Sequence, residues 1–175
     1  MNPIQSQLIL GGARSGKSRY AETLADQYSK DVLYLATSRA LDDEMSARVE
    51  KHQLDRPSHW KTIEEPLDLN GVLKREGNVP GRVILVDCLT LWLMNLLEEE
   101  RDIADEVSGL LEQLPNLKSI VVFVSNEISM GVVPMGQLSR LFVDELGRLH
   151  QSLAQKVEAV TLMVAGIPLS VKANE

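Results

Sequence analysis

A chain of 175 residues, 44% of them hydrophobic, is long enough to bury a core and predicts one domain over residues 1–175. Its formal charge of −7 and its lack of a long lysine or arginine run argue against a nucleic-acid-binding protein, which must neutralise phosphates. The single cysteine, Cys88, excludes an internal disulfide and fits a cytoplasmic protein, and neither a signal peptide nor a transmembrane segment is visible.

The first two predicted elements flank a glycine-rich turn. Gln7–Leu10 is typical of a buried strand, and a helix is expected to open at Ser18. Backbone N–H groups of such a turn surround phosphates, its lysine reaches the β- and γ-phosphates, and its final hydroxyl ligates Mg²⁺. A turn without a ligand is the disfavoured alternative, because every fixed position of the pattern G-x-x-x-x-G-K-[ST] is matched. The predicted nucleoside triphosphate site, with Lys17 catalytic and Ser18 a metal ligand, is Gly11, Gly12, Ala13, Arg14, Ser15, Gly16, Lys17 and Ser18.

A second strand is expected at Val32–Ala36, a short apolar run typical of a parallel strand covered on both faces. Together with the first strand and helix it makes a βαβ unit. Thr37, Ser38 and Arg39 follow at the carboxyl end of this strand, where open α/β sheets place their ligands. Contacts to a nucleotide and a polar loop with a helix cap are equally good interpretations of these three residues.

The next helix is expected to begin at the acids 42–44, which complement the helix dipole and so favour capping over metal binding. Met45 and Val49 give this helix a short apolar stripe, and His52 lies on the edge of that stripe. Pro57 is expected to end the helix. From spacing alone, a partly buried histidine at a helix end is the favoured interpretation of His52.

The segment 82–87 predicts a buried strand that ends in the acid Asp87, as a Walker B strand does. Its carboxylate would hold Mg²⁺ through water, from the strand next to the phosphate loop. A lone acid after an apolar strand is common, so this assignment gains its weight from Lys17 and Ser18. The preceding segments, a strand over 59–64 and a short helix through Leu69 and Leu73, are weakly patterned.

The second half of the chain continues the alternation of helices and strands. The segment 89–97 is apolar nearly all round, which predicts either deep burial or a subunit interface. His59 and His150 are interpreted as structural. The later elements are a helix over 103–114, a strand over 119–124, a ligand-edge loop over 125–134, a helix over 138–153, a core strand over 160–165 and an edge strand over 168–172.

These elements predict an α/β fold of the P-loop NTPase type, a three-layer sandwich whose mostly parallel sheet has an antiparallel edge strand near the C-terminus. The guanine-specifying sequence Asn-Lys-x-Asp is absent, which disfavours a regulatory GTPase. A small-molecule kinase is the leading general interpretation. A nucleotide-dependent regulatory or scaffold protein that uses residues 89–97 as an interaction face is the alternative from another class.

Several motifs occur together and in order over nearly the whole chain. They are GGARSGKS (11–18), Ala36-Thr37-Ser38 with Asp42-Asp43-Glu44-Met45 and Arg48, His52 with Arg56-Pro57 and His59-Trp60, and Asn126-Glu127 with Met130-Gly131 and Val133-Pro134. On these motifs the chain resembles the bifunctional adenosylcobinamide kinase / adenosylcobinamide-phosphate guanylyltransferase family of cobalamin biosynthesis.

The resemblance implies a kinase that phosphorylates adenosylcobinamide with ATP or GTP, and a transferase that moves GMP from GTP onto that phosphate through a guanylylated histidine. The nucleophile would be His52, and Asp87 would bind nucleotide and metal. The family also implies Mg²⁺ and a homotrimer. Two departures occur: Lys51 stands where some members carry a second histidine, and Asp87 where some carry glutamate. The other implied nucleotide contacts are the turn 11–18, Thr37, Ser38, Arg39, Gln53, Leu54, Asp55, Arg56 and Glu64.

Overall fold

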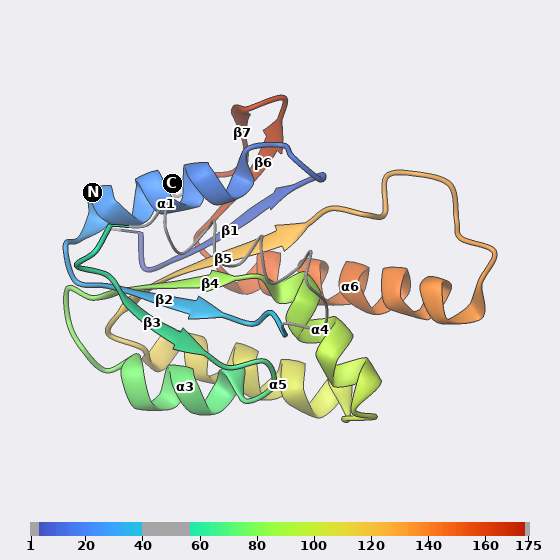
Figure 1. The fold of residues 1–175 in the computed structure, drawn as a ribbon, viewed down its shortest axis with the longest axis horizontal. Helices are drawn as coiled ribbons and strands as arrows, with labels where there is room; N and C mark the ends of the chain where they lie inside the picture. Colours follow the sequence, from blue (N-terminus) through green and yellow to red (C-terminus); the bar gives the residue numbers. More distant parts are fainter. Residues whose placement is uncertain (1–3, 40–56, 174–175) are drawn as a thin grey trace.

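A computed structural model describes residues 4–39 and 57–173 of the chain. These residues build a seven-stranded sheet in the order β3-β2-β4-β5-β1-β6-β7 (Figure 1). All neighbouring pairs are parallel except β6 and β7, which are antiparallel at one edge. The strands are β1 (Ser6–Gly11), β2 (Val32–Ala36), β3 (Lys61–Glu64), β4 (Val83–Asp87), β5 (Ile120–Asn126), β6 (Ala159–Val164) and β7 (Ile167–Lys172).

Helices cover both faces of the sheet, which confirms the predicted three-layer α/β sandwich with an antiparallel edge. Helix α1 lies on one face and packs Ala21 and Ala25 into one buried apolar cluster. Helices α3 to α6 lie on the other face and share a larger buried cluster (Figure 1). The helices are α1 (Lys17–Tyr28), α3 (Leu69–Glu76), α4 (Leu89–Glu98), α5 (Ile103–Gln113) and α6 (Gln137–Lys156), with a 3-10 turn at Leu114–Asn116.

Helix α4 is the apolar helix for which burial and a subunit interface were both open. Leu89, Trp92, Leu93 and Leu96 are fully buried, against β5, α5 and α6. The Trp92 indole donates to the Leu67 carbonyl oxygen at 2.9 Å, so its one polar group is also satisfied inside the chain. Deep burial is therefore the correct alternative, and this helix offers no large interaction face.

Helix α6 confirms the predicted helix over 138–153 but buries only part of its apolar side chains. Leu146, Leu149 and Leu153 are buried, but Leu138 and Leu141 in its first two turns are 66% and 43% exposed. Those turns extend beyond the sheet together with the loop that precedes them (Figure 1). Among the described residues, no helix combines the length and the hydrophobicity that crossing a membrane requires.

A buried polar network joins the end of β5 to α4 and α6. The Ser125 hydroxyl lies 2.7 Å from His150 Nε2 and 3.1 Å from Thr90 Oγ1. On the other side of the ring, His150 Nδ1 lies 3.7 Å from Glu127 Oε2. Burial lowers the pKa of the His150 imidazole, and the Glu127 carboxylate opposes that shift only in part. His150 is thus a structural residue, as the sequence predicted.

This burial predicts a loss of stability in mild acid. Below the ordinary imidazole pKa of 6.5, the unfolded chain takes up a proton that the folded protein resists. The free energy of unfolding should therefore fall as pH drops through this value, by up to about 1.4 kcal/mol per pH unit from this group, with no such contribution above it.

Urea unfolding at pH 7.5 and pH 5.5 tests this expectation. His150→Gln should destabilise at both values but should lose part of the difference between them. His59→Gln, at the half-exposed histidine, is the control and should keep that difference. An equal pH difference in the wild type and in His150→Gln would contradict the assignment.

Candidate nucleotide-binding site

The phosphate loop is the turn between the last residue of β1, Gly11, and the first residue of α1, Lys17. Gly16 at the N-cap has φ 91°, a left-handed conformation that disfavours any side chain. Among the residues that the structure describes, no side chain caps α1, and its first turn carries no acid that would compete with an anion for the N-terminal N–H groups. A helix start of this kind, under a glycine-rich turn, is a binding site for phosphate.

The loop is held close to the strands beneath it. A Cβ at Gly11 would lie 2.4 Å from Ser15 Oγ and 3.0 Å from the Met163 carbonyl oxygen of β6, so glycine favours this close approach. The turn between β6 and β7 supports the loop from the side, because Gly166 N donates to the Ser15 carbonyl oxygen at 3.0 Å. Ser15 Oγ is buried and makes no hydrogen bond with the described residues.

Lys17 and Ser18 occupy the first two positions of α1 and are both half-buried. Lys17 Nζ lies 3.3 Å from the Gly12 carbonyl oxygen, so the ammonium folds back over the loop. Gly12, Ala13 and Arg14 form the exposed tip of the turn. The predicted residues 11–18 are therefore brought together, with one cation above a row of backbone donors.

Asp87 ends β4, and its carboxylate accepts a hydrogen bond from Tyr34 Oη at 2.8 Å. The expectation that this acid lies on the strand next to β1 is wrong, because β5 separates β4 from β1. Asp87 nevertheless projects toward the α1 face, since Val83 and Leu85, at alternate positions of β4, pack in the α1 cluster. Sequence reasoning missed Tyr34, whose only sign was a hydroxyl within an apolar run.

Thr37 has a structural role that position alone did not reveal. Its side chain is fully buried, and its hydroxyl donates to the Cys88 carbonyl oxygen at 2.7 Å and accepts from Cys88 N at 2.9 Å. Asn95 Nδ2 donates to the Thr37 carbonyl oxygen at 2.8 Å. The Thr37 N–H donates to the Asp87 carbonyl oxygen at 3.2 Å, so Thr37 joins the ends of β2 and β4 through its backbone as well as its hydroxyl.

Arg39 points toward the end of α4, where its guanidinium lies 2.8 Å from Glu99 Oε1 and 3.9 Å from Glu98 Oε2. To contact a nucleotide it would have to exchange these acids for phosphate. Ser38, between Thr37 and Arg39, is half-buried. The structure therefore does not bring the Arg39 guanidinium to the phosphate loop.

Glu64 lies at the end of β3, paired with Ala36 of β2. Four strand spacings separate β3 from β1, roughly 19 Å at the usual interstrand distance. A ligand that contacted both Glu64 and the phosphate loop would have to extend along the carboxyl edge of the sheet. His52, Gln53, Leu54, Asp55 and Arg56, together with the acids 42–44, lie outside the described residues.

Neither a cysteine nucleophile nor a metal centre made by protein ligands alone fits the described part of the site. Burial and the neighbouring Asp87 charge raise the pKa of the Cys88 thiol to about 11, so Cys88 is protonated at neutral pH and is a poor nucleophile. Residues 4–39 and 57–173 contain no group of three or more His, Cys, Asp or Glu residues that could hold a metal ion alone. The described site is therefore suited to binding phosphates rather than to a protein-only metal centre.

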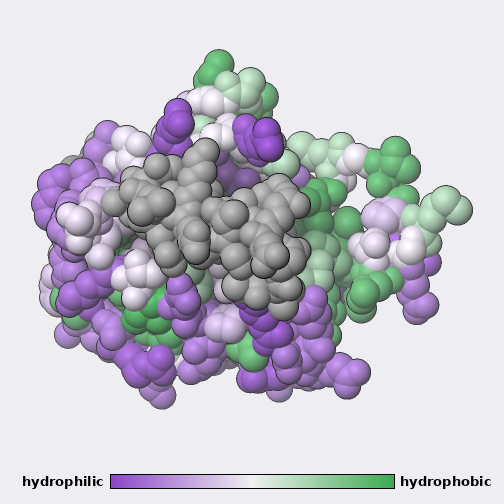
Figure 2. All heavy atoms as spheres, viewed as in Figure 1, coloured by the Kyte–Doolittle hydropathy of each residue, from purple (hydrophilic) through white to green (hydrophobic). Residues whose placement is uncertain are grey.

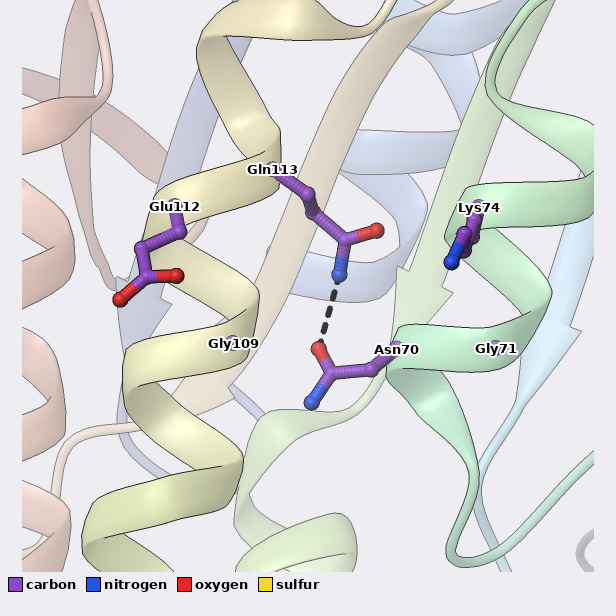
Figure 3. Close-up of a pocket in the computed structure, with 6 residues that line it drawn as sticks. All are labelled: Asn70, Gly71, Lys74, Gly109, Glu112 and Gln113. Atoms are coloured by element: carbon purple, nitrogen blue, oxygen red, sulfur yellow. Dashed lines mark hydrogen bonds between the residues drawn. The ribbon is translucent and has the colours of Figure 1, made fainter.

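A hollow away from the phosphate loop lies between α3 and α5, on the face of the sheet opposite α1 (Figure 3). Gln113 Nε2 donates to Asn70 Oδ1 at 2.8 Å across it, and Asn70 Nδ2 donates to the Glu106 carbonyl oxygen. These bonds join the two helices, so the polar groups of the hollow serve packing. It is lined by Asn70, Gly71, Lys74, Gly109, Glu112 and Gln113.

The fold is shared with solved structures of low sequence similarity. An ATPase from the type III secretion system of pathogenic bacteria matches 95% of this chain and 56% of its own at a TM-score of 0.57, with 13% identity. The flagellar accessory protein FlaH from Methanocaldococcus jannaschii matches 97% of this chain and 79% of its own at a TM-score of 0.50, with 17% identity. These likenesses confirm the predicted P-loop NTPase fold.

Sequence comparison gives the family. The bifunctional adenosylcobalamin biosynthesis protein CobP of Pseudomonas aeruginosa is 52% identical over 167 residues, 94% of this chain and 96% of its own. The corresponding protein CobU of Escherichia coli is 41% identical over 180 residues, 94% of this chain and 98% of its own. The model of the cobinamide kinase / cobinamide phosphate guanyltransferase family matches residues 7–171. With the phosphate loop, the acid-ended β4 strand and these matches in agreement, the chain belongs to the cobinamide kinase / cobinamide phosphate guanyltransferase family.

Proposed function

We propose that one domain, residues 1–175, phosphorylates the aminopropanol hydroxyl of adenosylcobinamide with ATP or GTP and then transfers GMP from GTP to that phosphate. The products of the second reaction are adenosylcobinamide-GDP and pyrophosphate. The observation that carries the proposal is the uncapped start of α1 beneath the glycine-rich turn, with Lys17 folded over it, in a chain of this family. The single, buried Cys88 is in keeping with a cytoplasmic enzyme.

The phosphate loop would serve both reactions by binding the polyphosphate. Backbone N–H groups over 12–17 and the Lys17 ammonium face the phosphates and spread the charge that develops on the departing group. This needs no large movement of the described residues, because Lys17 has only to exchange the Gly12 carbonyl for a phosphate oxygen. Preorganised donors of this kind are the main contribution that a protein makes to phosphoryl transfer.

Ser18 and Asp87 are the residues that would hold Mg²⁺. The ion takes oxygen ligands and commonly binds through one or two carboxylates, waters and substrate phosphates, so a site with one acid and one hydroxyl fits it. Tyr34, which donates to Asp87 Oδ2, would fix the orientation of that carboxylate. When bound, the ion would neutralise charge on the β- and γ-phosphates.

The guanylyl transfer would proceed in two displacements with His52 as the nucleophile. A neutral imidazole nitrogen attacks the α-phosphorus of GTP, the bond to the bridging oxygen breaks, and pyrophosphate leaves. A phosphate oxygen of adenosylcobinamide phosphate then attacks the same phosphorus, and the N–P bond breaks to restore His52. The proposal for His52 is supported by the family, since this residue lies outside the described part of the chain.

We further propose that the active form is a homotrimer. Apolar side chains gather over the loop before α6 and over its first turns (Figure 2). Val132 and Met135 are each 96% exposed, and an exposed apolar surface of this kind is typical of a subunit contact. The further members of this patch are Ile128, Met130, Val133, Leu138 and Leu141.

The guanylyl-histidine is tested by incubating the protein with [α-³²P]GTP. The wild type should retain label in an acid-labile, base-stable bond, and His52→Ala should retain none. His59→Ala is the matched control and should label as the wild type does. An unlabelled wild type would end the nucleotidyl part of the proposal, and phosphorylated product without a GDP-linked product would leave a plain kinase.

Lys17→Ala should lower the rates of both reactions by about 100-fold or more, because it removes the ammonium group that folds over the phosphate loop. Lys30→Ala, beyond the other end of α1, should leave both rates unchanged. Product formation with ATP or GTP measures the first reaction, and release of pyrophosphate measures the second. Turnover unchanged in Lys17→Ala would refute its role.

Analytical sedimentation tests the proposed homotrimer. The wild type should sediment at three times the chain mass of 19.4 kDa. Val132→Asp with Met135→Asp should shift the protein toward the monomer, because the charges would have to be buried at the contact. Ala104→Asp on the exposed face of α5 should not. A wild type at monomer mass would refute the trimer.

A further inference from the structure

The carboxyl end of β5 lies between the two strands that supply the proposed phosphate and metal ligands. Gly11, where the phosphate loop leaves β1, pairs with Asn126, the last residue of β5. On the other side of β5, Asp87 of β4 pairs with Val124, two residues earlier. Asn126 is therefore level with the start of the phosphate loop, and its strand is the neighbour of both β1, which leads into the loop, and β4, which carries Asp87.

The alternation of side chains along β5 decides which face Asn126 occupies. Val121 and Phe123 pack in the cluster under α4, α5 and α6, and Ser125 contacts His150 of α6. Val122 and Val124 pack in the cluster under α1. Asn126 continues the second series, so it lies on the α1 face, the face onto which Asp87 also projects.

The Asn126 side chain is half-buried and makes no hydrogen bond with the described residues. An amide carries two N–H donors, and leaving them unpaired in a partly buried position is costly unless a ligand or water binds them. Lys17 and Asp87 flank the place where the β- and γ-phosphates would lie, and Asn126 lies between them. A donor at this point is suited to a phosphate oxygen.

The backbone of Asn126 is fixed from the opposite face. Asn126 N donates to Thr90 Oγ1 at 2.7 Å, and Thr90 Oγ1 lies 3.1 Å from Ser125 Oγ, which in turn lies 2.7 Å from His150 Nε2. Thr90 and Ser125 are 6% and 0% exposed, so these contacts are shielded from water. The network ties the end of β5 to α4 and α6 and limits the movement of its last residue.

We propose that the Asn126 side-chain amide donates a hydrogen bond to the γ-phosphate of the bound nucleotide, and that Thr90 acts as a positioning residue for it through the Asn126 N–H. The inference rests on the proposed nucleotide site and adds to it a residue that distinguishes a triphosphate from a diphosphate. It also gives a function to the Asn126 position of the Asn-Glu sequence.

Calorimetric titration with α,β-methylene-GTP, which His52 cannot cleave between the α- and β-phosphates, and with GDP, each with Mg²⁺, tests the contact. One hydrogen bond to a charged group predicts that Asn126→Ala lowers the ratio of the two affinities by about tenfold, while GDP affinity changes less than threefold. Asn126→Asp, which keeps the size of the side chain but adds a charge, should lower the ratio further. A ratio within threefold of the wild type in both variants would overturn the contact.

The positioning role of Thr90 is tested with variants that separate an effect on nucleotide binding from an effect on protein stability. Thr90→Val removes the hydroxyl and should lower the affinity ratio, whereas Thr90→Ser should restore it. Thr161→Val is the matched control: Thr161 is also 6% exposed and accepts from Gln7 Nε2 at 3.0 Å, so its loss should lower stability without changing the ratio. An unchanged ratio in Thr90→Val would overturn the role of Thr90.

The same titrations separate this inference from the proposed function. A wild type that binds α,β-methylene-GTP while Asn126→Ala and Asn126→Asp keep its affinity ratio would remove only the Asn126 contact. A wild type that binds neither nucleotide would remove the nucleotide site and the inference with it.

Discussion

The turn from β1 into α1 is the constraint on which the rest of the molecule depends. The chain must leave a buried strand at Gly11 and fold back so that Ser15 lies close to Gly11. It then enters a helix through Gly16, whose backbone is in the left-handed conformation. Within the described parts of the chain, no side chain caps the first N–H groups of α1, and a helix end in this state is stabilised by an anion. The neighbouring strands and the β6–β7 turn hold the loop in place, so the fold prepares the site before any ligand arrives.

At the carboxyl edge of the sheet, the two faces have different roles. On the α1 face, Lys17, Asp87 and Asn126 present one cation, one acid and one amide toward the same region. On the opposite face, Thr90, Ser125 and His150 make a buried network that fixes the end of β5. Because strand residues alternate, one short strand carries both a candidate ligand contact and the contacts that hold it. Burial also makes this network sensitive to acid, since a proton on His150 favours the unfolded chain.

Much of the fold could be predicted from local pattern. The run 32–36 coincides with β2, the phosphate loop lies between β1 and α1, and the apolar 89–97 segment is a buried helix. The order of strands could not be predicted, because β4 and β5 are both apolar runs and nothing local says which one pairs with β1. For the same reason the position of Asp87 relative to the loop was wrong by one strand. The actual partners of Thr37 and Arg39 are distant in sequence, directly after β4 and at the C-terminal end of α4, and spacing carries no information about them.

A structure of the protein with GTP and Mg²⁺ bound tests the central claim most directly, because it locates the phosphates. The account predicts phosphate oxygens at hydrogen-bonding distance, about 2.7–3.2 Å, from backbone N–H groups of the loop 12–17, with the Lys17 ammonium beside them. It also predicts that the nucleotide extends along the carboxyl edge toward β3. Phosphates bound at any other place, with the loop of residues 11–18 empty, would contradict it.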